Sequence, residues 1–235
     1  MNKVAIVTGG TSGMGEAAVR ELTKRGWHVA SMARSKAEFQ GDVAKDADCR
    51  RVANEVVSKW GRIDALVNSA GTTKFVAHAD LEGLSAEDIE AIFRVNFIGP
   101  FQMIRACTPA LKATKGSIVN VSSVASILGT GSSIAYAASI AALDSMSISL
   151  ARALGPDIRV NVVAPGYVRT PWQVAAHGAE GARDLERRYA EKAPLKTAPE
   201  PQDVAEAIAW LLEGARAVTG EIIYIDGGMH IASPR

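Results

Sequence analysis

The sequence predicts an α/β fold in which a doubly wound parallel sheet carries helices on both faces. Short apolar runs alternate with amphipathic stretches along the chain, and these runs lack a polar face. Strands buried on both sides have this continuous apolar character, and amphipathic helices cover the faces of such a sheet. No linker or internal repeat divides the 235 residues, so we expect a single domain.

The pattern predicts each element in turn. Strands are expected at residues 4–7, 27–32, 65–67, 118–121, 159–163 and 221–225, and helices at 15–24, 46–60, 86–111, 137–154 and 202–213. Ser85 followed by Asp88 suits a helix start, and Pro100 and Pro109 are expected to bend or end parts of the third helix. Residues 35–43 are too few for a full helix and strand, so this sheet edge should be abbreviated.

Composition excludes several function classes. Twenty-six basic and twenty-five acidic residues leave a formal net charge of +1, and no run of like charges is present, so neither nucleic acid nor a membrane surface is an expected partner. The first apolar run is too short for a signal peptide and no later stretch is expected to span a bilayer, which predicts a cytoplasmic protein. Cys49 and Cys107 lack C-x-x-C spacing, which indicates reduced structural thiols, and the scattered histidines predict no metal site.

A glycine-rich turn, Thr8-Gly9-Gly10-Thr11-Ser12-Gly13-Met14-Gly15, lies between the first expected strand and the first expected helix. Glycines allow the backbone to turn sharply and to approach a pyrophosphate closely, which the free N–H groups and dipole of the helix then attract. Glycines also serve turns that bind nothing, so the position between strand and helix carries the prediction.

The end of the second strand indicates which dinucleotide is bound. An NAD enzyme commonly has an acidic residue here for the ribose 2'-hydroxyl, whereas this chain has Ala33 followed by Arg34. The alanine leaves room for a 2'-phosphate and the planar arginine fork can bind two of its oxygens. We therefore favour NADP(H) over NAD(H); the alternative is that Arg34 is a solvated surface residue.

Further motifs stand at Asn68-Ser69-Ala70-Gly71, Asn96, Ser122-Ser123, Tyr136 and Pro165-Gly166. With the glycine-rich turn, they resemble the short-chain dehydrogenase/reductase family along essentially the whole chain, which implies a Rossmann-type fold. The resemblance implies cofactor contacts from Gly9, Thr11, Ser12, Gly13, Met14, Gly15, Arg34, Asp42, Val43, Asn68, Ala70, Gly71, Tyr136, Pro165, Gly166, Val168 and Thr170. It also implies that Tyr136 and Ser123 are catalytic, and that Asn96 supports a proton-relay water.

This family carries a lysine four residues after the catalytic tyrosine, whereas this chain has Ile140 there. A free tyrosine has a pKa of about 10, so it is a poor base near neutral pH without a neighbouring positive charge. If the lysine and the cofactor's positive ring lower that pKa by roughly three units, losing most of this shift costs about 4 kcal/mol, or on the order of a thousandfold in phenolate. Alcohol oxidation should suffer most, because a neutral tyrosine can still donate a proton in carbonyl reduction. Lys74 is a conceivable replacement cation.

The predicted function is therefore NADP(H)-dependent carbonyl reduction and alcohol oxidation, impaired or atypical because of Ile140. One alternative is a non-catalytic NADP(H)-binding sensor or interaction protein. Another is a halohydrin dehalogenase-like lyase, which shares the serine and tyrosine but has arginine at the lysine position and lacks a working dinucleotide turn; Ile140 and the intact turn argue against it.

The expected small-molecule partner is a carbonyl or alcohol substrate, with residues 167–200 as a lid over it; the alternative is that this segment is a surface helical excursion with ordinary exposed charges. Its identity depends on that segment and on residues after Gly71 and Ser123. The resemblance also implies a homo-oligomer, a tetramer or dimer, built on the helices that begin near Ala86 and Tyr136.

Overall fold

Seven parallel strands form one sheet in this computed structural model, which describes residues 2–232. The strands are β1 (Val4–Thr8), β2 (His28–Ala33), β3 (Phe39–Gln40), β4 (Ala65–Asn68), β5 (Ser117–Val121), β6 (Arg159–Pro165) and β7 (Ile222–Ile225). Their order is β3-β2-β1-β4-β5-β6-β7, and every neighbouring pair is parallel. This confirms the doubly wound α/β prediction, and the chain changes direction across the sheet between β1 and β4. As expected, the edge formed by residues 35–43 is abbreviated to the two-residue strand β3.

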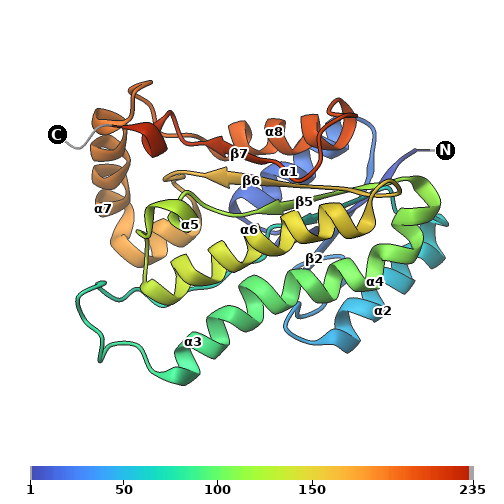
Figure 1. Cartoon of the computed structure of the whole chain (residues 1–235), viewed down its shortest axis with the longest axis horizontal. Coiled ribbons are helices and arrows are strands. Elements are labelled where there is room, and N and C mark those ends of the chain that lie inside the picture. Colours follow the sequence, from blue (N-terminus) through green and yellow to red (C-terminus); the bar gives the residue numbers. More distant parts are fainter. Residues whose placement is uncertain (1, 233–235) are drawn as a thin grey trace.

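Helices cover both faces of the sheet. They are α1 (Gly13–Lys24), α2 (Asp46–Trp60), α3 (Ala86–Phe93), α4 (Gly99–Thr114), α5 (Ala125–Leu128), α6 (Ile134–Leu154), α7 (Pro171–Lys192) and α8 (Pro201–Glu213), with a π turn η1 (Arg94–Ile98) and a short 3₁₀ turn η2 (Met229–Ile231). Helices α1 and α8 lie on one face, and α2, α4 and α6 on the other (Figure 1). The amphipathic stretches of the sequence thus form the two outer layers.

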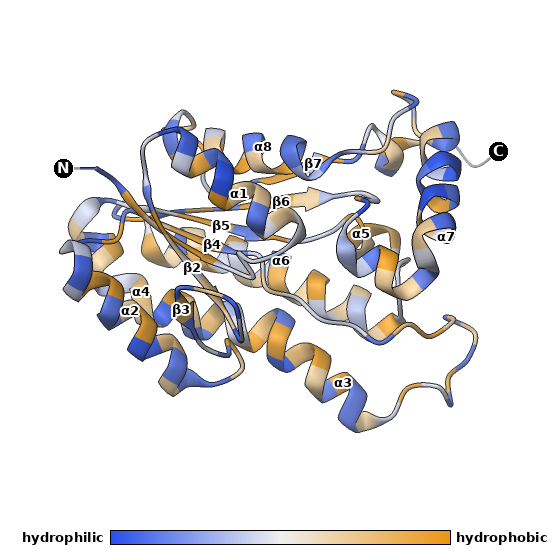
Figure 2. Cartoon of the chain, turned by 180° about the vertical axis from the view of Figure 1, so that it is seen from behind, coloured by the Kyte–Doolittle hydropathy of each residue, from blue (hydrophilic) through white to orange (hydrophobic). Residues whose placement is uncertain are grey.

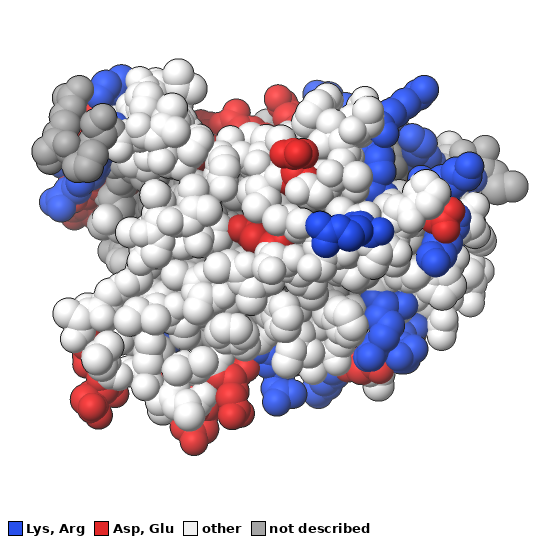
Figure 3. Space-filling model, viewed as in Figure 1, with Lys and Arg blue, Asp and Glu red and all other residues white. Residues whose placement is uncertain are grey.

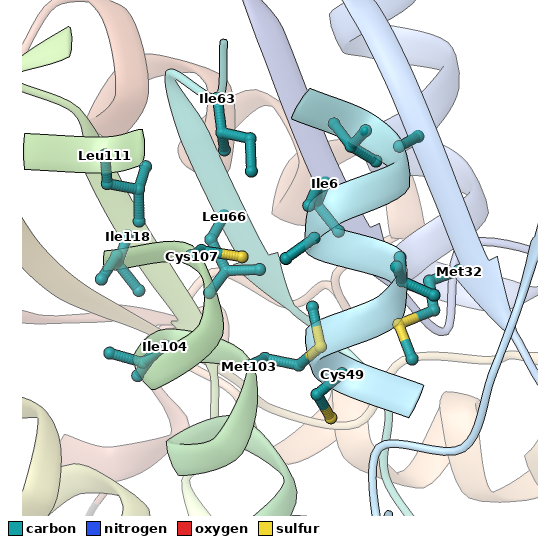
Figure 4. Close-up of a cluster of buried hydrophobic side chains, with 14 of the residues drawn as sticks. Ile6, Met32, Cys49, Ile63, Leu66, Met103, Ile104, Cys107, Leu111 and Ile118 are labelled. Carbon is teal, nitrogen blue, oxygen red and sulfur yellow. The ribbon is translucent and has the colours of Figure 1, made fainter. Parts of the chain in front are cut away.

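The core between α2, α4 and the sheet contains both cysteines. Cys49 comes from α2 and Cys107 from α4, and both thiols are free and buried among apolar side chains such as Leu66 of β4 (Figure 4). Burial raises the pKa of each thiol to about 12. These cysteines are therefore protonated packing residues, in agreement with the prediction of structural thiols.

The single helix expected at residues 86–111 is three segments, because the π turn η1 separates α3 from α4. The capping box predicted at Ser85 and Asp88 is present and begins α3. Pro100 lies in the first turn of α4, where its missing N–H is tolerated. Pro109 was expected to bend or end a helical segment. It does not end one, because α4 continues to Thr114. Residues on both sides of the proline, Cys107 and Leu111, are fully buried, and this packing offsets the helix-breaking tendency.

Helix α7 was expected only as the alternative to a lid, a helical excursion on the surface. Its only fully buried residue is Ala182, so the apolar periodicity that reveals a helix in the sequence is weak. Figure 2 shows mainly hydrophilic colour along it. Gly178 has φ of 71° and interrupts the helix with a kink. The segment 167–200, expected as a lid, is thus largely one kinked helix.

By length and composition alone, helix α6 could cross a membrane. The prediction that no stretch of this chain is apolar enough to span a bilayer was therefore too broad. Its buried residues include Ala151 and Leu143, and the helix packs along β6 beneath the sheet. An apolar core helix of this kind satisfies the same test as a membrane span. The packing accounts for the hydrophobic composition of α6.

Candidate active site

A cleft of about 500 Å³ opens at the carboxyl ends of β1, β2, β4 and β5. Ligands of doubly wound sheets bind at this edge, where the strand order reverses. Fifteen of the predicted site residues line it: Gly9, Thr11, Ser12, Gly13, Met14, Gly15, Arg34, Asp42, Val43, Asn68, Ala70, Gly71, Asn96, Tyr136 and Thr170. The fold therefore brings most of the predicted cofactor and catalytic residues together.

Four predicted residues, Ser123, Pro165, Gly166 and Val168, do not line this cleft. Val168 is buried, and Gly166 is covered by the ring of Tyr189. The neighbouring Ser122 lines the cleft where Ser123 does not. Other lining residues were not among the predicted contacts: Met32, Ala33, Ser35, Gly41, Ser69, Thr72, Val95, Pro100, Val121, Ser122, Ile140, Leu143, Pro171 and Trp172. Of these, the sequence had already placed Ala33 at the 2'-phosphate, Ile140 beside Tyr136 and Trp172 in the segment over the substrate. Most of the others are neighbours of predicted residues, and that adjacency was the signal available.

The glycine-rich turn has the close approaches that only glycine permits. Gly9 has φ of 67°, and a side chain there would meet the backbone of Ala70 at 3.0 Å. At Gly15 a side chain would lie 2.3 Å from the carbonyl oxygen of Gly9. Ser12 caps α1 without a side-chain hydrogen bond, so its hydroxyl is not engaged in capping the first turn of the helix. This arrangement forms a cradle for a phosphate at a helix N-terminus.

The turn is held against the next strand by Thr8 at the end of β1. Its buried Oγ1 accepts hydrogen bonds from the backbone N–H groups of Ser69 and Ala70, both at 3.1 Å. The amide of Asn68, also buried, donates to Asn120 at 2.8 Å. In the described part of the chain the Asn68 Oδ1 has no partner, which leaves a buried acceptor at the cleft. A buried acceptor of this kind and a glycine cradle both suit a dinucleotide.

At the outer end of the cleft, Arg34 is exposed and follows Ala33, with Ser35 beside it. Asp42 is oriented locally, since its carboxylate accepts from the N–H of Ala44 at 3.0 Å and its own N–H donates to Asp48 at 3.0 Å. The adenosine end of a dinucleotide would thus meet one cation and one acidic side chain already engaged by the backbone. The residues present fit a nicotinamide dinucleotide phosphate.

Tyr136 lies in the first turn of α6, which Ser133 caps by accepting from the Tyr136 N–H at 3.2 Å. Its ring meets that of Trp172 edge-on, with centroids 6.1 Å apart. Burial raises the pKa of Tyr136, and the Ser123 hydroxyl opposes this shift. The Ser123 oxygen is itself oriented by the N–H of Ala125 at 3.2 Å. The tyrosine is therefore a neutral phenol with a serine hydroxyl close by.

Ile140 follows Tyr136 by one helical turn and lines the same cleft, with 5% of its surface exposed. Lys74, the cation considered as a replacement from the sequence, forms an ion pair with Asp88 at 2.6 Å. Burial raises the pKa of Tyr136 and Ser123 lowers it, and within residues 2–232 no lysine or arginine contributes to this shift.

Asn96 lies within the π turn η1, a type of helical irregularity that is frequent at functional sites. Its Nδ2 donates to the carbonyl of Thr72 at 2.9 Å and to Ser139 at 3.0 Å, and its Oδ1 accepts from the Thr72 N–H at 2.8 Å. Ser139 in turn donates to the carbonyl of Tyr136 at 2.8 Å. Both side-chain hydrogens of Asn96 are thus engaged by protein, so a relay water would need another group of this residue. The side chain joins the loop after β4 to the turn that carries Tyr136.

No group of three His, Cys, Asp or Glu side chains within residues 2–232 is arranged to hold a metal ion. The glycine-rich turn at the switch point and Tyr136 at the far end of the cleft, with Ser123 close by, are typical of an oxidoreductase of the Rossmann dinucleotide-binding class.

Comparisons with known proteins agree with this class. Residues 9–230 match the family model described as enoyl-(acyl carrier protein) reductase. The 3-oxoacyl-(acyl-carrier-protein) reductase of Thermotoga maritima is 36% identical over 250 residues, covering 97% of this chain and 98% of that protein. The ligand-free aldohexose dehydrogenase of Thermoplasma acidophilum superposes with a TM-score of 0.93 at 27% identity, covering 100% of this chain and 96% of that one. The structure of ElxO with NADP bound superposes with a TM-score of 0.87 at 25% identity, covering 97% and 99%. The chain belongs to the short-chain dehydrogenase/reductase family.

Proposed function

We propose that this protein reduces carbonyl compounds with NADPH, and oxidises the corresponding alcohols far more slowly. The observation that carries the proposal is Tyr136, a half-buried phenol in the cleft with Ser123 close by, whose pKa is raised by burial and is lowered by no cation of residues 2–232. A phenol that stays neutral is already in the form that donates a proton to a developing alkoxide. The reverse reaction needs the phenolate, which this environment disfavours.

The preference for NADP(H) over NAD(H) is supported by the end of β2. Ala33 leaves space beside the ribose, and the exposed Arg34 can supply a bidentate donor to a 2'-phosphate. ElxO, a structural neighbour, is described with NADP bound. An acidic residue at position 33 would repel the phosphate, and this chain has none there.

Bound NADPH would supply the hydride, and the protein would supply the proton and the orientation. The residues of the glycine-rich turn would hold the pyrophosphate, and Asn68 and Thr170 line the cleft between that turn and Tyr136. Tyr136 would give its hydroxyl proton to the substrate oxygen, while Ser123 would hold that oxygen by a hydrogen bond. Ile140 would contribute only apolar surface at the place where the family has a cation, so the nicotinamide ribose would lose an anchor.

The test begins with binding, followed by turnover. NADPH and NADH are titrated against the protein, and NADPH oxidation is then followed with a panel of ketones and aldehydes for this chain and for Ile140→Lys. Tighter binding of NADPH, with slow ketone reduction that increases in Ile140→Lys, supports the proposal. Failure to bind either cofactor overturns it. Turnover that is equal in the two proteins removes Ile140 as the limiting residue.

The second candidate is a non-catalytic NADP(H)-binding protein that senses the cofactor or holds a partner. It is favoured by the same absence of a cation at Tyr136. Tight NADPH binding without turnover in this chain, and restored turnover in Ile140→Lys, would favour it. Release of halide without a cofactor would instead support the halohydrin dehalogenase-like alternative.

We also propose that the chain forms a homo-oligomer, a tetramer or dimer, through the face built by α4 and α6. This face is largely uncharged (Figure 3). Phe101 and Ile148 are 41% and 42% exposed on these helices. Apolar side chains gathered on an uncharged face are typical of an interface between subunits. Sedimentation of the purified chain tests the oligomeric state.

A soluble NADPH-using reductase of this kind fits a cytoplasmic location.

A further inference from the structure

Four aromatic side chains form a continuous surface beside the cleft, which we call the aromatic wall: Phe75, Tyr136, Trp172 and His177. Trp172 meets Tyr136 edge-on with ring centroids 6.1 Å apart, and it meets Phe75 edge-on, also at 6.1 Å. Phe75 meets His177 edge-on at 5.1 Å. Tyr136 and Trp172 line the cleft itself, so the other two rings extend the wall outward from the tyrosine hydroxyl.

The segment that carries Phe75 is held in place by the loop before α6. The Val76 N–H donates to the carbonyl of Ser132 at 2.8 Å, and the hydroxyls of Thr73 and Ser132 lie 2.7 Å apart. Gly131 in the same loop packs against the Tyr136 ring, where an added side chain would lie 3.5 Å from it. The hydrogen bonds between residues 73–76 and the loop before α6 therefore position Phe75 relative to Tyr136.

Trp172 and His177 lie on the part of α7 that precedes the kink at Gly178. The part beyond the kink is tied to the sheet by hydrogen bonds from Tyr167 to the carbonyl of Ala182 at 2.7 Å and from Tyr189 to that of Asp226 at 2.8 Å. These two anchors fix the direction of the part beyond the kink, and the part before it is held by the ring contacts of Trp172 and His177 with Tyr136 and Phe75. The wall thus has a defined shape before any ligand arrives, which reduces the entropy lost on binding.

The wall carries aromatic surface without a fixed charge. Phe75 and Trp172 remain 41% and 38% exposed, although each already contacts two other rings. Lys74, the nearest basic residue along the chain, is paired with Asp88. Among the four rings only the His177 imidazole could meet a carboxylate or phosphate next to the carbonyl, and it lies at the end of the wall away from Tyr136, whereas an uncharged ring can make further edge-to-face contacts with Trp172 and Phe75.

We propose that the aromatic wall selects carbonyl compounds that carry an uncharged aromatic or conjugated ring next to the reacting group, with Trp172 as the main specificity residue. The inference rests on the proposed function, because Tyr136 is the hydroxyl that would meet the carbonyl oxygen. The ring of the substrate packs against Trp172 and Phe75 while the carbonyl lies at Tyr136.

The test compares two ketones that differ only in the ring, 1-phenylpropan-2-one and 1-cyclohexylpropan-2-one. Each is titrated calorimetrically into the full chain, with and without saturating NADPH, so turnover is not required. The phenyl ketone is expected to bind about threefold to tenfold more tightly, the advantage that aromatic contacts give beyond buried area. Trp172→Leu should bring this ratio to about one, and Trp172→Phe should retain most of it.

The matched control is Trp210→Leu, which removes an exposed tryptophan from α8 and should leave the ratio unchanged. Phe75→Leu provides a second variant in the wall and should lower the ratio in part. Equal binding of the two ketones to the unmodified chain, or a ratio that survives Trp172→Leu, overturns the inference. Failure to bind NADPH, or a complete lack of turnover although NADPH binds, counts against the proposed function instead. The ratio of the two ketone affinities is measured separately from turnover.

Discussion

Ile140 stands one helical turn after Tyr136 on α6, and both side chains line the same cleft. Residues four apart share a helix face, so Ile140 is correctly placed to influence the tyrosine but carries no charge with which to do so. Asp144 stands one further turn along and is buried. The electrostatic character of the site depends on this one face of α6.

Ile140→Lys is expected to raise alcohol oxidation near neutral pH by up to about a thousandfold, because an adjacent ammonium favours the phenolate of Tyr136. In the unmodified chain the pKa of Tyr136 is raised by burial, so kcat/KM for oxidation should keep rising with pH up to pH 10 and beyond. In the variant the same profile should level off at lower pH. The measurement is kcat/KM for alcohol oxidation against pH with saturating NADP⁺.

The control for this change is Ile140→Met, which keeps an apolar side chain of similar volume and should leave the profile unchanged. Carbonyl reduction should gain less than oxidation in Ile140→Lys, since the neutral phenol is already its proton donor. Identical pH profiles for Ile140→Lys and the unmodified chain would show that this position does not control Tyr136.

Arg34→Ala should weaken NADPH binding by about tenfold or more while changing NADH binding little, as expected for loss of a charge-assisted bidentate contact. Fluorescence titration of both cofactors provides the two dissociation constants. Lys36→Ala removes a cation two residues away and is the matched control. Equal losses for NADPH and NADH would remove Arg34 from the 2'-phosphate site.

Thr8→Val should destabilise the fold by about 1–3 kcal/mol, because the buried Thr8 hydroxyl accepts from two backbone N–H groups that would be left without a partner. Urea unfolding measures this change in the free energy of unfolding. Thr8→Ser retains the oxygen and should recover most of the loss. A valine variant as stable as the serine variant would mean that water satisfies the two N–H groups.

The sheet and the positions of most of its strands were accessible from the sequence because strands buried on both faces leave continuous apolar runs. The glycine-rich turn was equally clear, since Gly9 and Gly15 make contacts that exclude any side chain. Helix α7 could be offered only as an alternative to a lid, because its apolar surface is slight and its kink depends on Gly178. The sequence placed Trp172 in the segment over the substrate, but its contact with Tyr136 depends on the path of α7.

The candidate catalytic positions were chosen by their spacing, but their surroundings could not be predicted in this way. The sequence offered Lys74 as a replacement cation, whereas the fold directs it to Asp88. Asn96 was predicted to support a water, yet both hydrogens of its amide are donated to Thr72 and Ser139. Such partners come from segments distant in the chain, and no local pattern encodes them.

Asp144→Asn should stabilise the protein increasingly as the pH rises. Burial raises the pKa of Asp144, which the hydroxyls of Ser122 and Ser126 oppose, so the folded state favours the protonated acid more than the unfolded chain does. The stability that this proton provides is fully present below the unfolded pKa of about 3.9, and it is lost as the pH rises through the higher folded value. Asparagine has nearly the same shape and never ionises, so the variant avoids that loss, by about 1.4 kcal/mol for each unit by which the folded pKa is raised.

The measurement is the free energy of urea unfolding for both proteins at intervals from pH 4 to pH 9. The difference between them should grow through the lower part of this range and then become constant above the folded pKa of Asp144. Glu180→Gln removes one carboxylate from the exposed part of α7 and is the control for net charge, with a difference that stays small at every pH. A gap between Asp144→Asn and the unmodified chain that does not change with pH would show that Asp144 titrates as it does in the unfolded chain. The buried carboxyl behind Ile140 would then be ionised in the folded protein at neutral pH, and a lysine introduced at 140 would have a ready partner there, one that competes with Tyr136 for its charge.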